Sequence, residues 1–95
     1  MTLTQGNETL LALEKRAKAL EEFKDLVARI RLSGSRQSEF ELTQMLWLDF
    51  AEQQSRERSG VFAVPTPTIA TQMYAIEMEA LLRARIRELQ ETYEA

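Results

Sequence analysis

The hydrophobic positions in the first third of the chain recur every three or four residues from about residue 7 to residue 32. Seven residues make up this apolar stripe: Leu10, Leu13, Ala17, Leu20, Phe23, Val27 and Ile30. Their mean spacing is slightly shorter than a helical turn of about 3.6 residues. The stripe therefore winds slowly around the helix, as it does in a left-handed coiled coil. The pattern predicts one long helix over residues 7–32 and a flexible lead-in over residues 1–6.

Residues 33–37 predict a turn, and a second helix is expected over about residues 38–58. Gly34 is a favourable residue for ending a helix, and Ser38 with Glu41 forms a Ser-x-x-Glu capping box, which marks a helix start. The second helix is apolar on two sides, one with Leu42, Met45, Leu46 and Phe50, the other with Phe40, Trp47 and Ala51. Because a helix with two apolar faces needs two neighbours, we expect it to be the centre of the fold.

A third helix is predicted over about residues 67–93, with Thr66 as N-cap and Pro67 at the first helical position. Residues 61–64, which precede it, are apolar and extended, and we expect them to plug the end of the bundle. The apolar stripe of the third helix changes sides near its middle. The first half carries Ile69, Met73, Ile76 and Ala80, and the second half carries Met78, Leu82, Ile86, Leu89 and Tyr93 on nearly the opposite side.

We expect the first half of this helix to pack on the other two helices and the second half to contact a partner. A break near residue 78 is the alternative, but no Gly or Pro lies there to cause one.

Together these patterns predict an all-α fold with a single domain over residues 7–95. A long antiparallel helical hairpin of the first two helices, joined by a third long helix, would form a three-helix bundle-like protomer. A domain this small buries a modest area and has no cysteine for disulfides, so we expect a homo-oligomer. The predicted contact residues of that interface are Met78, Leu82, Ile86, Leu89, Tyr93, Trp47 and Phe40.

The composition excludes most catalytic chemistry. The chain has no His and no Cys, so it cannot build a Ser-His-Asp triad, a Cys-His pair or a zinc site. It also lacks a phosphate-binding Gly-rich loop, a calcium loop and a dinucleotide fingerprint. We therefore expect a protein that is not an enzyme and that uses no cofactor or metal ion.

Charge and hydropathy indicate a cytoplasmic protein. The start of the chain has neither the basic nor the apolar region of a signal peptide. The longest apolar runs are four residues, too short to span a membrane. The net charge of −3 is small and opposite in sign to that of a typical nucleic-acid binder. We therefore expect no association with membranes.

One set of residues still permits ligand binding. If the helices run up, down and up, six arginines gather near one end of the bundle: Arg29, Arg31, Arg36, Arg83, Arg85 and Arg87. Guanidinium groups bind phosphate well, but Glu39, Glu41 and Glu88 fall in the same region and compete for them. The cluster is therefore either a set of structural ion pairs or an anion-binding site.

Residues 35–45, which follow an amphipathic helix, are loosely similar to part of a known domain. The resemblance is to the turn and second helix of the hairpin domain in phage anti-defence proteins that sequester cyclic nucleotides. Only the pattern Ser35-Arg36 followed by Leu42-Thr43 matches fully. Trp47 is out of step with that family's tryptophan, and the third helix has no clear counterpart, so we do not assign the chain to the family. The resemblance would imply a phage-encoded protein.

The functional hypothesis is a small non-enzymatic helical interaction module, such as an adaptor, assembly factor or inhibitor. It would present apolar helix faces to a second copy of itself and to another protein. The alternative is a phosphate-ligand binder, for a nucleotide or nucleic acid, that uses the arginine cluster.

Overall fold

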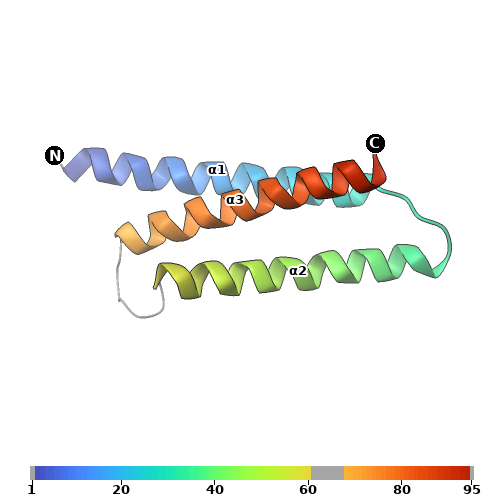
Figure 1. Ribbon diagram of the computed structural model, residues 1–95. Coiled ribbons are helices and arrows are strands. Elements are labelled where there is room, and N and C mark those ends of the chain that lie inside the picture. The colour runs from blue at the N-terminus through green and yellow to red at the C-terminus, as the bar shows by residue number, and fades with distance from the viewer. Residues whose placement is uncertain (1, 61–67, 95) are drawn as a thin grey trace.

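The computed structural model describes residues 2–60 and 68–94, which form three helices and no strand. Figure 1 shows α1 (Thr2–Arg29), α2 (Ser35–Ser59) and α3 (Thr68–Tyr93). The predicted all-α, three-helix bundle is confirmed, and α3 is continuous through residue 78. The expected plug at residues 61–64 and the expected cap at Thr66 and Pro67 lie outside the described residues.

The first residues of α1 and α2 differ from those expected from the sequence. α1 begins at Thr2 rather than near residue 7, and α2 begins at Ser35, so the capping box at Ser38 is not used. Gly34, at φ 62°, precedes α2 in a conformation that favours glycine. The Gln37 side chain closes the turn instead: its Oε1 accepts from the Leu32 N–H at 2.7 Å and its Nε2 donates to Glu41 at 2.9 Å.

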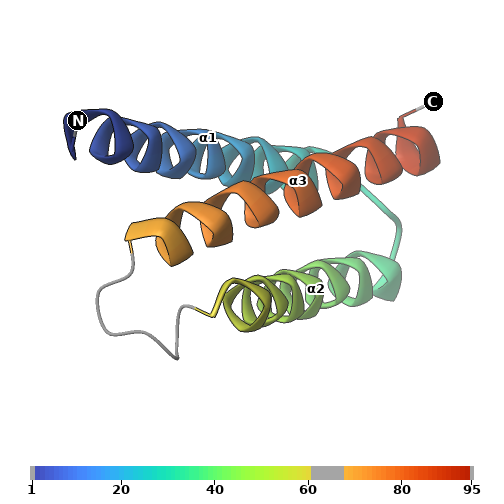
Figure 2. The same cartoon turned by 60° about the vertical axis from the view of Figure 1, so that its left-hand side comes forward.

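α1 and α3 run parallel, and α2 runs antiparallel to both (Figure 1). α3 packs most closely on α1, packs less extensively on α2, and lies between them in both views (Figures 1 and 2). The expectation that α2 is the centre of the fold is therefore wrong, and α1 with α2 does not form a closely packed hairpin. The bundle is open, because α1 and α2 contact each other little.

The sequence of α3 explains why it takes the central place. Ala75 and Leu82 are fully buried and Met78 nearly so, while α1 supplies Ala19 and Leu26 to the same core. Alanine carries only a methyl group, so the two helices approach closely where Ala19 and Ala75 lie. The side of α3 that begins with Tyr74 and Ala75 is thus the buried side along most of the helix.

The two halves of the α3 stripe have exchanged their expected roles. Ile69, Met73 and Ile76 are more than half exposed, although we expected them to pack on the other helices. Met78, Leu82 and Leu89 are buried within the protomer, although we expected them to await a partner. Because α3 lies between α1 and α2, the second set can contact both helices at once, and the first set points away from them.

Candidate protein-interaction surface

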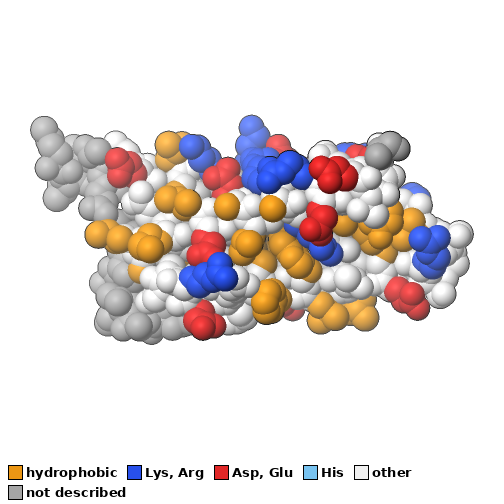
Figure 3. All heavy atoms as spheres, in the orientation of Figure 1, with side chains coloured by type: hydrophobic (Ala, Val, Ile, Leu, Met, Phe, Trp, Pro, Cys, Tyr) orange, Lys and Arg blue, Asp and Glu red, His pale blue; other side chains and the backbone are white. Residues whose placement is uncertain are grey.

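The outward side of α2 is apolar and exposed. Leu42, Met45, Leu46 and Phe50 are 57%, 66%, 60% and 65% exposed. They lie at positions i, i+3, i+4 and i+8, which places them on one helix face. We call these four residues the α2 outer stripe. In Figure 3, hydrophobic side chains gather along the lower edge of the molecule, over α2.

The opposite side of α2 faces the rest of the protein. Its buried residues are Phe40, Gln44, Ala51 and Ser55. The Ser55 hydroxyl lies 3.7 Å from the Met78 sulfur, and the Gln44 side chain contacts Arg85 of α3. Since this side already meets α3, the α2 outer stripe points away from the core and has no neighbour among the described residues. The predicted second neighbour of α2 is therefore missing among the residues that the structure describes.

Carboxylates border the α2 outer stripe. Glu39, Asp49 and Glu57 are exposed, and none forms an ion pair within the part of the chain that the structure describes. From residue 38 to residue 57 the sole cation is Arg56, which is bound to Glu52 at 2.9 Å and lies over the Tyr74 ring. Arg36 and Arg58 lie just beyond the two ends of this range, and Arg58 is paired with Glu77. Carboxylates therefore outnumber cations around the stripe.

A second exposed apolar patch occurs at the other end of α3, where Ile69, Met73 and Ile76 lie on one face. Leu10 and Leu11 of α1 are also at least half exposed. Residues 61–67, which lead into α3, are outside the description at this end of the molecule. The α2 outer stripe is formed by four exposed residues of one continuous described helix, and we take it as the candidate surface.

The residues predicted to form an oligomer interface lie mainly inside the protomer. Met78, Leu82, Leu89 and Phe40 are buried, and Ile86 packs against the core. We expected the apolar face in the second half of α3 to have no neighbour within the chain. This expectation is wrong, because α1 and α2 cover that face. Tyr93 remains 40% exposed.

Two aromatic contacts involve the remaining predicted interface residues. The Trp47 ring lies 5.3 Å from the Phe23 ring of α1, between ring centroids, and the Arg85 guanidinium lies 5.3 Å above its centre. The Tyr93 ring meets the Phe40 ring edge to face at 5.1 Å. Trp47 thus joins all three helices, and the Phe40–Tyr93 pair closes the end where α2 begins and α3 ends.

The six arginines of the predicted cluster do not converge. Arg83 pairs with Glu22 of α1 and with Glu79, whereas Arg85 faces α2. Successive residues of a helix are about 100° apart, so residue 85 points to nearly the opposite side of α3 from residues 83 and 87, which share one face. Arg31, Arg36 and Arg87 are exposed and form no ion pair with a described side chain.

Arg29 is held at the end of the bundle by Glu94. Its Nε and Nη2 donate to the two carboxylate oxygens at 2.8 and 3.0 Å, which is a bidentate ion pair. These hydrogen bonds, followed by the charge of the partner, raise the pKa of Arg29 and lower the pKa of Glu94. Both groups stay charged near neutral pH, so Arg29 is engaged within the chain.

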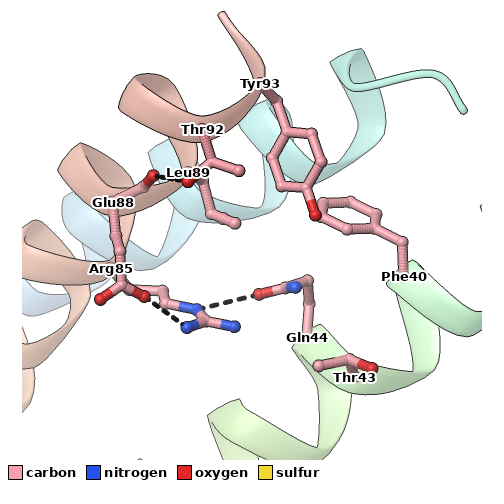
Figure 4. Close-up of a pocket in the computed structure, with 8 residues that line it drawn as sticks. All are labelled: Phe40, Thr43, Gln44, Arg85, Glu88, Leu89, Thr92 and Tyr93. Carbon is pink, nitrogen blue, oxygen red and sulfur yellow. Dashed lines mark hydrogen bonds and ion pairs between the residues drawn. The ribbon is translucent and has the colours of Figure 1, made fainter.

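Arg85 lines a groove between α2 and α3, shown in Figure 4. Its Nε donates to the Gln44 oxygen at 3.0 Å, and its Nη1 donates to Glu88 at 2.6 Å. The groove has a volume of about 210 Å³, and Phe40 and Tyr93 lie across from the arginine. Because Glu88 neutralises the guanidinium, the groove offers little attraction to an anion.

Neither a metal centre nor a membrane span is found in the described part of the chain. No group of three acidic side chains there could hold a metal ion. No helix among the described residues combines the length and the apolarity needed to cross a bilayer. In comparisons with known proteins, no family model, no curated protein and no solved structure matches this chain.

Proposed function

We propose that this protein is a small, non-enzymatic, cytoplasmic interaction module that binds another protein through the α2 outer stripe. The observation that carries the proposal is the exposure of Leu42, Met45, Leu46 and Phe50 on one helix face. Contiguous apolar patches on small proteins commonly mark interaction sites. A helix that presents residues i, i+3, i+4 and i+8 matches the way amphipathic helices pair with a partner.

The apolar side chains of the stripe would contribute a limited part of the free energy of binding a partner. Burying a fully exposed large apolar side chain contributes about 1.5–3 kcal/mol. The four side chains are a little over half exposed, so covering them all would contribute roughly 4–7 kcal/mol. Association itself costs about 4–15 kcal/mol. The stripe alone therefore does not give tight binding, and contacts at its border must add to it.

The alternative function, a phosphate-ligand binder, has weaker support. Arg29, Arg83 and Arg85 are already engaged by carboxylates. Arg29 and Arg83 line one pocket between α1 and α3, together with Glu22 and Asp25, whereas Arg85 faces α2. A phosphate site needs guanidinium groups that converge. The interaction module is therefore the function that we favour.

Crosslinking inside the cell that encodes the protein tests the proposal. A photoreactive benzophenone amino acid would replace Leu46 in one variant and Glu21, an exposed residue of α1, in a control variant. We expect a discrete adduct with another protein from position 46 and none from position 21. Adding Phe50→Glu should abolish the adduct, since a carboxylate in an apolar contact is costly. No adduct from position 46, or equal adducts from both positions, would contradict the proposal.

A further inference from the structure

The charges around the α2 outer stripe indicate which kind of partner can bind there. Elsewhere on the molecule, Glu22, Glu77 and Glu94 are paired with arginines of other helices. Several exposed carboxylates of α1 form no ion pair with a described side chain, but Lys15, Lys18 and Lys24 lie among them in the sequence. At the stripe, Glu39, Asp49 and Glu57 have neither an ion pair among the described residues nor a lysine near them in the sequence. Three exposed carboxylates therefore lie along an exposed apolar face, and Arg36, three residues before Glu39, is the nearest cation on α2 without an ion pair among the described residues.

The spacing of these carboxylates sets the length of a matching partner. Glu39 and Glu57 are five turns apart on the same side of α2, which is about 27 Å at about 1.5 Å per residue. Asp49 lies between them along α2, about 80° around the helix from both and on the face of Leu42 and Met45. A helix of about 18 residues that follows the stripe is long enough to span all three carboxylates.

The same charges argue against three other occupants. Two copies joined through their α2 outer stripes would bring two acidic faces together, and like charges oppose such an interface. A nucleic acid or an anionic membrane surface is also negatively charged, so it is repelled. A positively charged segment is attracted, and its cations would supply the border contacts that the apolar residues alone lack.

We propose that the α2 outer stripe binds an amphipathic helix of another protein, one whose apolar face is bordered by lysine or arginine side chains. This inference rests on the proposed function and adds the chemistry of the partner. The apolar residues Leu42, Met45, Leu46 and Phe50 meet the apolar face of that helix. Glu39, Asp49 and Glu57 meet its basic side chains and fix its position along α2.

Three synthetic helical peptides of about 18 residues test the inference. They share one apolar face of leucines and carry lysine, glutamine or glutamate at the flanking positions. Binding to the full chain would be measured by calorimetry at low and at moderate salt. We expect the lysine peptide to bind at least tenfold more tightly than the glutamine peptide at low salt, with the difference shrinking as salt screens the charges. The glutamate peptide should bind weakest.

A matched pair of variants tests whether the three carboxylates cause the preference for the lysine peptide. The triple substitution Glu39→Gln, Asp49→Asn, Glu57→Gln should remove the preference for the lysine peptide and leave glutamine-peptide binding unchanged. A control, Glu8→Gln, Glu14→Gln, Glu21→Gln, changes the net charge equally on exposed positions of α1. It should keep most of the preference.

The outcomes separate this inference from the proposed function. Equal binding of all three peptides, sensitive to Leu46→Glu but not to the charge substitutions, would overturn the basic partner and leave the interaction module standing. Binding of none of them at high micromolar concentration would contradict both. A wild-type dimer that Leu46→Glu dissociates would overturn the inference by showing a second copy at the stripe.

Discussion

Replacing Leu82 by alanine is expected to lower the free energy of unfolding by about 2–5 kcal/mol. Leu82 is fully buried in the core between α3 and its neighbours, so the truncation leaves a cavity that the tightly packed helices cannot fill. For a domain of this size such a loss is a large share of the total stability. Urea denaturation followed by circular dichroism measures the change.

Leu46→Ala is the matched control for this experiment. The chemistry is the same, and both residues lie inside long helices, but Leu46 is 60% exposed on the α2 outer stripe. Surface substitutions of this kind change stability by only about 0.5 kcal/mol in either direction. If Leu46→Ala were as costly as Leu82→Ala, the assignment of buried and exposed faces would be wrong.

Trp47→Ala is expected to cost about 3 kcal/mol, near the lower end of the usual range for a core tryptophan. The lower end applies because Trp47 is only partly buried. The loss is nevertheless large, since this ring contacts Phe23 of α1 and lies under Arg85 of α3. Its removal takes away a ring contact and a cation–π contact that join α2 to the other helices.

Denaturation followed by far-ultraviolet circular dichroism tests this value, because the variant has no tryptophan left to report by fluorescence. Phe50→Ala, which truncates an exposed aromatic residue of the same helix, should cost far less. In the wild type, the emission of the single tryptophan should be shifted to shorter wavelength than that of a fully hydrated indole. Full hydration of Trp47, or equal costs for the two variants, would refute its placement between the helices.

Periodicity alone predicted the three helices, but it did not predict which helix lies in the middle. The apolar positions of α2 predict two faces that need cover, and a helix at the centre of the fold would have neighbours on both. Only the Phe40 and Ala51 side is covered. The signal for the uncovered side was the charge: residues 38–57 contain five acidic residues and one arginine.

The roles of the two α3 stripes could not be read from spacing, since both stripes have helical periodicity. The two stripes differ in the size of the residues that lie beside them on α3. Ala75 lies beside Met78 and Leu82, and this small residue lets α1 approach closely. The stripe of Ile69, Met73 and Ile76 offers no such small residue until Ala80. Close approach of two helices depends on such small side chains, so the stripe with Met78, Leu82 and Leu89 became the core.

The arginines show a different limit of prediction from the sequence. An up, down and up arrangement of the helices brings these arginines to one end of the bundle, but residues two apart on a helix lie about 200° apart. Arg83 and Arg85 therefore face α1 and α2 respectively, where Glu22 and Gln44 receive them. The expected competition from Glu88 is confirmed for Arg85, whereas Glu39 and Glu41 bind none of the described arginines.

The most direct test of the α2 outer stripe compares two methionine methyl groups by nuclear magnetic resonance. Met45 is 66% exposed on the stripe, and Met78 is 2% exposed in the core. In the free protein, a soluble paramagnetic agent should broaden the Met45 methyl signal and leave the Met78 signal sharp. Adding the lysine-flanked peptide should protect Met45 and leave Met78 unchanged. A Met45 signal that is already protected in the free protein, or one that stays broadened with the peptide bound, would contradict the assignment of this face as the binding surface.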